Sequence, residues 1–159
     1  MRRPRFFAFA SRPGLAALAA VAAAGAHGHG HAEPCHPATT QQVAALFDRW
    51  NTALQSGRPE RVAALYADRS VLLPTLSSKP RITAEDKLDY FAHFLGQKPV
   101  GRVETTWIDI GCNTAIDTGL YTFALANGRS VKARYTFTYR YDAEGWRITS
   151  HHSSVLPEP

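Results

Sequence analysis

Apolar residues between positions 39 and 56 recur three or four residues apart, which is the spacing of one helix face. Thr39 is followed three residues later by Gln42, the spacing of a capping box at a helix start. Gly57 is suited to end this helix, because glycine readily adopts the conformation found at helix ends. The sequence therefore predicts a long first helix whose buried face comprises Val43, Leu46, Phe47, Trp50 and Leu54.

Shorter elements follow up to residue 96. Pro59 suits the first turn of a second helix, which we expect to extend to Tyr66. Ser70–Leu73 has the pattern of a brief strand. Thr83 with Asp86 marks the start of a third helix. Its expected apolar face consists of Leu88, Phe91, Phe94 and Leu95.

Beyond residue 100 the pattern changes to strands. Val103–Ile110 is rich in β-forming residues, and Thr118–Leu125 runs back after a turn. Asn127-Gly128 is a strong hairpin signal, and Val131–Tyr141 alternates between aromatic and polar positions. Trp146–Ser154 forms the last strand. Helices first and strands afterwards predict an α+β fold, with the N-terminal helices packed on a strongly bent antiparallel sheet.

The N-terminal segment has the arrangement of a secretory signal peptide. Met1–Arg12 is basic, and the apolar run Leu15–Ala26 is too short to span a bilayer. Cleavage after Ala26 or after Ala32 fits the small residues there, and Arg2-Arg3 leaves a twin-arginine export route open. We expect residues 1–26 to be removed and the protein to be exported to the periplasm without a stable membrane anchor.

Residues 27–38 have the composition of a flexible tether, because Gly, Pro and His dominate and no apolar period is present. His27, His29, His31 and His36 also give this stretch the composition of a metal-binding tract. A solvated linker is the favoured interpretation, and loose binding of copper, nickel or zinc is the alternative. We expect no cofactor, and a single domain over residues 39–157.

The formal net charge of +5 belongs largely to the leader. Four arginines precede residue 27 and no acid does, so the remaining chain has 14 basic and 13 acidic residues. Nucleic-acid-binding domains usually carry a strongly basic surface. We therefore exclude nucleic acid as a partner.

Cys35 and Cys112 are the two cysteines of the chain. In an oxidising compartment an even number favours a disulfide over two buried thiols. Such a bond would tie the N-terminal end of the domain to the sheet and restrict the unfolded chain.

Several local strings resemble the nuclear transport factor 2-like superfamily: Leu46–Asn51, Val62–Ala67 and Val71–Pro74. The ending, from Gly145-Trp146 through His151-His152-Ser153-Ser154, is similar to bacterial relatives of the calcium/calmodulin-dependent protein kinase II association domain, of the SgcJ/EcaC type. The resemblance covers residues 40–157.

This resemblance implies a cone-shaped fold in which a bent sheet closes over a long helix and leaves a pocket at its open end. Members of the superfamily include oligomerisation hubs and small-molecule isomerases, so the fold alone does not assign a function. Kinase activity is not implied, because the chain contains no kinase motif. In the kinase hub arginines line the pocket, and two of their positions fall near Phe137 and at Ser153 here. We therefore do not expect the same anionic ligand.

His151 and His152 are adjacent on a strand and should point to opposite faces of the sheet, one of them inward. An inward histidine can serve as a base or ligand donor, or be a hydrogen-bonded structural residue, and the structural role is favoured. Arg134 could hold an acidic ligand, but we favour an ion pair with Glu104 or Asp109. The full set of candidate pocket residues is Trp50, Tyr90, Phe94, Tyr121, Arg134, Tyr135, Phe137, His151 and His152.

Catalysis has weak support in the sequence. Asp89, Asp109 and Asp117 are the carboxylates near candidate pocket elements, and each is expected at a turn, strand end or helix surface. No acid–base pair results, and no catalytic residue is assigned. We expect an exported, self-associating binding or assembly module with a small, largely apolar pocket and a small-molecule ligand. The alternative is a pocket enzyme, such as an isomerase or cyclase, or a small-molecule carrier.

Overall fold

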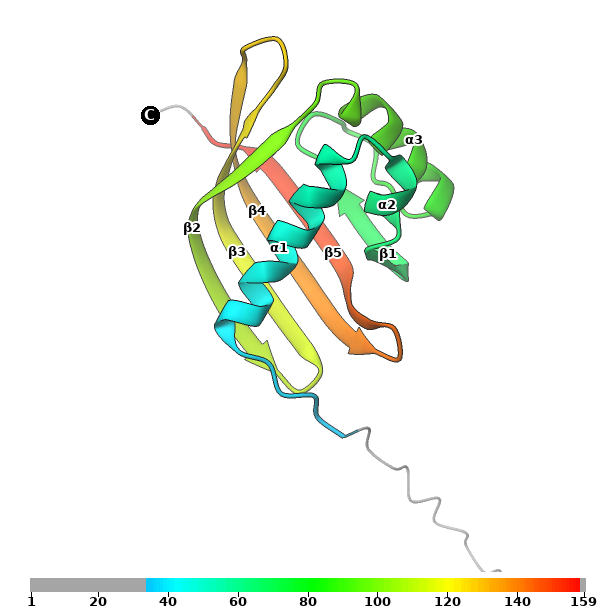
Figure 1. Cartoon of the computed structure of the whole chain (residues 1–159), viewed down its shortest axis with the longest axis vertical. Helices are drawn as coiled ribbons and strands as arrows, with labels where there is room; N and C mark the ends of the chain where they lie inside the picture. Colours follow the sequence, from blue (N-terminus) through cyan, green and yellow to red (C-terminus); the bar gives the residue numbers. More distant parts are fainter. Residues whose placement is uncertain (1–33, 158–159) are drawn as a thin grey trace, which may run out of the picture. The chain divides into compact units, whose positions relative to one another are not determined.

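The computed structural model describes residues 34–157, so the expected signal peptide and most of the expected tether lie outside the described residues. Figure 1 shows a long helix crossing one face of a curved sheet, with the two shorter helices beside the sheet's first strand. The elements are α1 (Thr40–Gln55), α2 (Pro59–Ala63), β1 (Tyr66–Leu73), α3 (Ala84–Leu95), β2 (Val100–Gly111), β3 (Thr114–Ala124), β4 (Ser130–Asp142) and β5 (Gly145–Val155).

The five strands form one open sheet in the order β1-β5-β4-β3-β2. The strands β2 to β5 form an antiparallel meander, as the hairpin signals predict. The expectation of a wholly antiparallel sheet is wrong at one edge, because β1 lies parallel to β5, with Leu72 opposite His151. The chain leaves β1 through α3 and enters the sheet again at the opposite edge, so no hairpin imposes an antiparallel direction on this pair.

Two boundaries differ from the sequence prediction. Tyr66 begins β1 rather than ending α2, and Ala64 caps the shortened helix. Strand β3 begins at Thr114, four residues before the expected start, which places Asp117 within the strand. Tertiary contacts explain the first difference, since the Tyr66 hydroxyl bonds to side chains of α1 and β5.

Both expected capping boxes are present. The Thr39 side chain accepts a bond from the Gln42 backbone, and the Gln42 side chain accepts one from the Thr39 backbone. Thr83 and Asp86 make the same reciprocal pair at the start of α3. These bonds satisfy backbone donors that have no partner within the helix. None of the described helices is long and apolar enough to cross a membrane.

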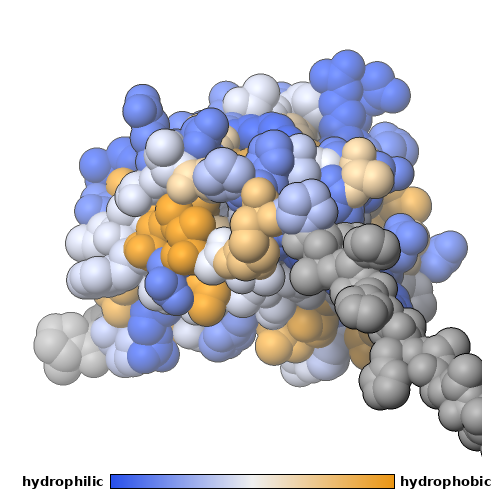
Figure 2. Space-filling view, turned by 90° about the horizontal axis from the view of Figure 1, so that it is seen from below, coloured by the Kyte–Doolittle hydropathy of each residue, from blue (hydrophilic) through white to orange (hydrophobic). Residues whose placement is uncertain are grey.

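The core lies between α1 and the concave face of the sheet. The buried face of α1 consists of the five predicted residues. Trp50 packs edge-on against Phe137 of β4 and Phe123 of β3. Strands β3 and β4 bury every second residue, so their aromatic positions form this core and their intervening positions face outward. Figure 2 looks at the molecule from below relative to Figure 1. On this end, groups of hydrophobic residues are bordered by hydrophilic residues.

Lys87 is buried on α3, although it is not among the apolar residues predicted for the buried face of this helix. Its ammonium group donates to the carbonyl oxygens of Ser70 at 3.0 Å and Ile82 at 2.8 Å. Burial lowers the Lys87 pKa, and the Asp86 carboxylate acts in the opposite direction. Because the ammonium group of Lys87 is bonded to the Ser70 carbonyl of β1, this lysine joins α3 to β1.

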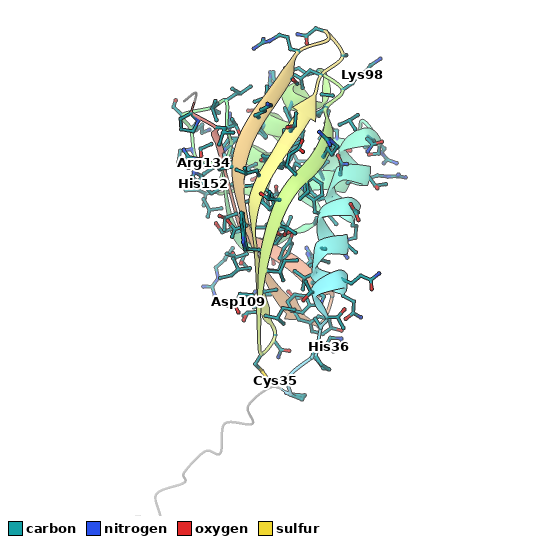
Figure 3. The ribbon with its side chains drawn as sticks, turned by 90° about the vertical axis from the view of Figure 1, so that its left-hand side faces the viewer. Cys35, His36, Lys98, Asp109, Arg134 and His152 are labelled. Carbon is teal, nitrogen blue, oxygen red and sulfur yellow. A yellow bond between two sulfur atoms is a disulfide. The ribbon has the colours of Figure 1, made fainter. Side chains whose placement is uncertain are left out.

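The N-terminal end of the described chain is held against the sheet. Cys35 and Cys112 form the expected disulfide, with their Cα atoms 5.0 Å apart. The His36 ring stacks on Tyr141 at 3.7 Å between centroids, and its backbone N–H donates to the Asn113 side chain. The last residues of the expected tether are therefore attached to the domain rather than free. Figure 3 shows Cys35 and His36 at this end of the molecule.

Candidate functional site

His151 on β5 lies on the concave side of the sheet and is 3% exposed. Its ring stacks on Phe137 with 3.9 Å between centroids. Its Nδ1 atom lies 2.9 Å from the hydroxyl of Tyr66, and that hydroxyl accepts a 3.2 Å bond from Trp50 Nε1. Burial lowers the pKa of His151 to about 3, with a smaller contribution from His152, so the imidazole is neutral at neutral pH. Its other nitrogen, Nε2, is buried without a hydrogen-bond partner among the described residues.

A chain of hydroxyl groups lies two residues further along β5. Tyr121 of β3 donates to Ser153 Oγ at 2.5 Å, and Ser153 also bonds to Thr75. Burial raises the pKa of the Tyr121 phenol, so this group remains protonated. Strands β3 and β5 and the loop after β1 thus bring three hydroxyls together beside the histidine.

These groups line an interior pocket between α1, α3 and the sheet. Its free space is about 20 Å³, which is room for about one water molecule. The lining residues are mostly aromatic and aliphatic: Trp50, Leu72, Pro74, Thr75, Leu76, Tyr90, Phe91, Phe94, Tyr121, Phe123, Leu125, Val131, His151 and Ser153. The pocket is therefore small, largely apolar and lined by no charged side chain.

Asp117 forms a second polar cluster on the concave face, outside this pocket. It is 1% exposed, and its Oδ1 accepts bonds from Thr106 at 2.6 Å and Tyr135 at 2.9 Å. Burial raises the Asp117 pKa, while both hydrogen bonds act in the opposite direction. The Tyr139 hydroxyl is buried without a partner in the described chain. The carboxylate is enclosed, and it does not line the pocket that holds His151.

The convex face of the sheet carries a different set of residues. Trp107 of β2 is 64% exposed and borders a shallow hollow of about 540 Å³ together with Arg134 and His152. Figure 3 shows Arg134, His152 and Asp109 on the side of the sheet away from α1. The strand register places Trp107 beside Thr118, and Thr136 beside both Thr118 and His152. One row of residues thus extends across this face from Trp107 to His152.

The structure separates the nine predicted pocket residues into three groups. Five line the pocket: Trp50, Tyr90, Phe94, Tyr121 and His151. Tyr135 and Phe137 are buried core residues outside its lining, and Arg134 and His152 lie on the convex face. The last two assignments were wrong because alternate residues of a strand point to opposite faces.

The favoured ion pair of Arg134 is also not formed. Glu104 pairs instead with Arg102 of its own strand at 2.7 Å. Within residues 34–157, neither Arg134 nor Asp109 belongs to an ion pair. Arg134 lies opposite Leu120 and Ser154, so its strand neighbours carry no charge.

Asp117, Tyr66 and Ser153 belong to these polar clusters but were not among the predicted site residues. Asp117 was expected at a strand end, although it shares the period of two with Tyr121 and Phe123 and could have been placed inward by that period. Tyr66 was assigned to a helix, and no local signal connects it to His151, 85 residues later. Ser153 was noted only as the position of a hub arginine, and it is part of the pocket wall.

The metal hypothesis concerns residues that the structure describes only in part. His27, His29 and His31 lie outside the described residues, whereas His36 is stacked on Tyr141. Between residues 34 and 157, no three His, Cys, Asp or Glu side chains are grouped so that they could hold a metal ion.

Comparison with solved structures supports the fold. A calcium/calmodulin dependent protein kinase II association domain protein from Xanthomonas campestris is 44% identical, with a TM-score of 0.73, over 77% of this chain and 91% of that one. A protein of the same description from Thiobacillus denitrificans is 19% identical, with a TM-score of 0.62, over 79% of this chain and all of the other. A protein from Streptomyces avermitilis, described as a dehydratase of the NTF2-like family, is 16% identical, with a TM-score of 0.66, over 74% of this chain and 96% of that one.

The two more distant similarities concern the fold alone. No curated protein matches the chain. The family model of the calcium/calmodulin dependent protein kinase II association domain matches residues 39–157, which is the whole described domain apart from its first residues. The chain belongs to the calcium/calmodulin dependent protein kinase II association domain family and has the NTF2-like fold of that family.

Proposed function

We propose that this protein is an exported, non-catalytic assembly module that pairs with a second copy of itself through the convex face of its sheet. The observation that carries the proposal is the contrast between the two faces. The interior is almost filled, with about 20 Å³ of free space, whereas Trp107 stands 64% exposed on a broad convex face. Aromatic side chains are enriched in protein interfaces relative to the rest of the surface.

The charges of the convex face favour a second copy as the partner. Arg134 and Arg140 lie on β4, and Asp109 lies on β2. A two-fold axis brings the same surface of two copies together. Placing β2 of one copy over β4 of the other brings Asp109 near the arginines and lets Trp107 pack against the partner's sheet. Placing β4 over β4 would oppose like charges.

Two further observations bear on export and catalysis. The Cys35–Cys112 disulfide supports export, because such bonds persist in oxidising compartments. Asp117 is buried and does not line the pocket. This favours assembly over pocket catalysis, since a general base must reach the proton that it removes. The family name, which refers to association, supports the same choice.

Sedimentation equilibrium of the disulfide-bonded protein tests self-association. We expect a dimer or larger assembly at micromolar concentration, and a loss of affinity of at least about 10-fold in Trp107→Glu, since interface aromatics often contribute more than 1.4 kcal/mol. Ile82→Glu is the matched control, because Ile82 is 63% exposed but lies outside the sheet. A monomeric wild type, or equal effects of both variants, would contradict the proposal.

A charge exchange tests the proposed pairing of β2 with β4. Asp109→Arg should weaken association, and Asp109→Arg combined with Arg134→Asp should restore part of it. Restoration is expected only if the two positions face each other across the interface. If the affinity losses of the two substitutions simply add in the double variant, this pairing of β2 with β4 is excluded. The proposal that the protein self-associates would then still stand.

A further inference from the structure

The hydrogen bonds around His151 determine which of its nitrogens carries the proton. Tyr66 Oη accepts the Trp50 N–H and has one proton of its own. Among the described residues, the remaining partner of this hydroxyl is Nδ1 of His151. If Tyr66 donates to Nδ1, the neutral imidazole carries its proton on Nε2. The opposite tautomer would leave both the Tyr66 proton and Nε2 without partners.

His151 therefore presents an N–H donor at Nε2, and this donor has no acceptor within the described protein. A buried polar group of this kind is costly to leave unpaired. His151 is one of the residues that line the pocket, so an acceptor could satisfy this donor if it displaced the side chains that cover Nε2. The stacked Phe137 and the edge-on Trp50 hold the ring in place.

The walls of the pocket restrict the chemistry of a molecule that could enter. No charged side chain lines it, so a carboxylate or an ammonium group would be buried without a counter-ion. The nearby Arg81 is bound to Asp89 at 2.9 Å outside the lining. The aromatic and aliphatic side chains of the wall suit an apolar body.

The size of the free space adds a second restriction. The free space of the pocket as it stands holds about one water-sized group. Leu76, in the loop between β1 and α3, lines the pocket yet is 58% exposed, so a ligand that pushed it toward solvent would disturb less packing than one that displaced a buried wall residue. A compact ligand can then place its acceptor at Nε2 and its apolar part at Leu76.

We propose that the interior pocket binds a small, neutral, largely apolar molecule that offers a carbonyl oxygen, or an equivalent acceptor, to the Nε2–H group of His151. This site is independent of the proposed assembly face, because His151 and His152 point to opposite sides of β5. Binding consists of one new hydrogen bond and the burial of apolar surface, and it requires no covalent step.

A matched set of probes tests the proposal by NMR titration of the full disulfide-bonded protein. Cyclopentanone carries the acceptor, methylenecyclopentane has the same shape without it, and isobutyrate carries a charge. We expect cyclopentanone to bind about 10-fold or more tightly than methylenecyclopentane, which is the discrimination of one buried hydrogen bond. We expect isobutyrate to bind least. Equal affinity for the ketone and the alkene, tighter binding of isobutyrate, or a pocket that holds water alone would overturn the proposal.

Two variants and one direct measurement complete the test. His151→Phe should abolish the preference for the ketone, and His152→Phe on the convex face should retain it. Nitrogen-15 NMR of the unmodified protein should show the neutral Nε2–H tautomer of His151, with a shift of that nitrogen when cyclopentanone binds. The opposite tautomer in the wild type would overturn the proposal even if the variants failed to fold. Loss of assembly in Trp107→Glu should leave ketone binding unchanged.

Discussion

Folded and unfolded chains differ in the proton affinity of His151. Its pKa is about 3 in the folded protein, against 6.5 for the free side chain, because burial disfavours the charged ring. Between pH 6.5 and pH 3 only the unfolded chain takes up this proton, so the free energy of unfolding falls as the pH falls. Above pH 6.5 the residue contributes no pH dependence.

We therefore predict that lowering the pH from 7 to 5 costs about 2 kcal/mol of stability through His151, at about 1.4 kcal/mol per pH unit. Urea unfolding at both values, in the wild type and in His151→Phe, measures this difference. Tyr66 faces the ring and remains protonated throughout, and Asp117 has a raised pKa whose effect has the opposite sign but is shared by both proteins. Equal pH dependence in the two proteins would show that His151 is solvated or charged in the fold.

At the scale of elements, the contact between β2 and β3 depends on a glycine. A Cβ atom at Gly119 would lie 2.0 Å from the Thr105 carbonyl oxygen and 2.8 Å from its carbon. Thr105 directly follows the register shift in β2 between Val103 and Thr105, and its backbone lies against the side of Gly119 where a side chain would be. No side chain rotation can relieve a clash with backbone atoms.

Gly119→Ala should therefore lower the free energy of unfolding by roughly 2–4 kcal/mol, the range of strongly strained substitutions. Thermal or urea unfolding gives the value, and hydrogen exchange should show the loss first in β2. Gly96→Ala is the control, since its added Cβ meets one atom at 3.3 Å and its backbone is not in the left-handed region. Similar small effects at both sites would mean that the irregularity in β2 absorbs the extra atom.

At the scale of the whole molecule, the disulfide joins the start of the domain to the turn between β2 and β3. The two cysteines are 77 residues apart, and closing a loop of this length removes roughly 4 kcal/mol of unfolded-state entropy in the loop-closure description. Cys35→Ser combined with Cys112→Ser should therefore unfold at lower urea concentration than the oxidised wild type.

Reductant supplies the control for this prediction. Reduced wild type and the double variant should have the same stability, and the oxidised wild type should exceed both by about 2–4 kcal/mol. Stability that does not change with reductant would mean that the bond contributes nothing to the fold. The assembly face lies on the opposite side of the sheet from α1, so association should persist in the double variant.

The local sequence was sufficient to predict the three helices and the hairpins, but not the end of α2 or the start of β3. Thr39 and Thr83 predict helix starts because capping bonds form within four residues. Asn127-Gly128 predicts a hairpin because its tight turn also depends on neighbouring residues only. The alternation in β4 correctly separates its buried and exposed residues, since side chains of a strand alternate between faces. The family resemblance, confirmed by the comparisons, supplied the overall fold.

Contacts between distant segments decided the rest. The register of β5 places His151 opposite the buried residues Phe137 of β4 and Leu72 of β1, so His151 faces inward and His152 outward, a choice that two adjacent histidines leave open. Tyr66 and His151 meet only after that pairing forms, and Asp117 is enclosed only when β2 and β4 lie on either side of it. Periodicity and capping act over a few residues, whereas burial and hydrogen-bond partners depend on which strands meet. Local patterns therefore predict most of the elements and the family, whereas contacts between distant strands set which polar groups are buried and which molecules the pocket can accept.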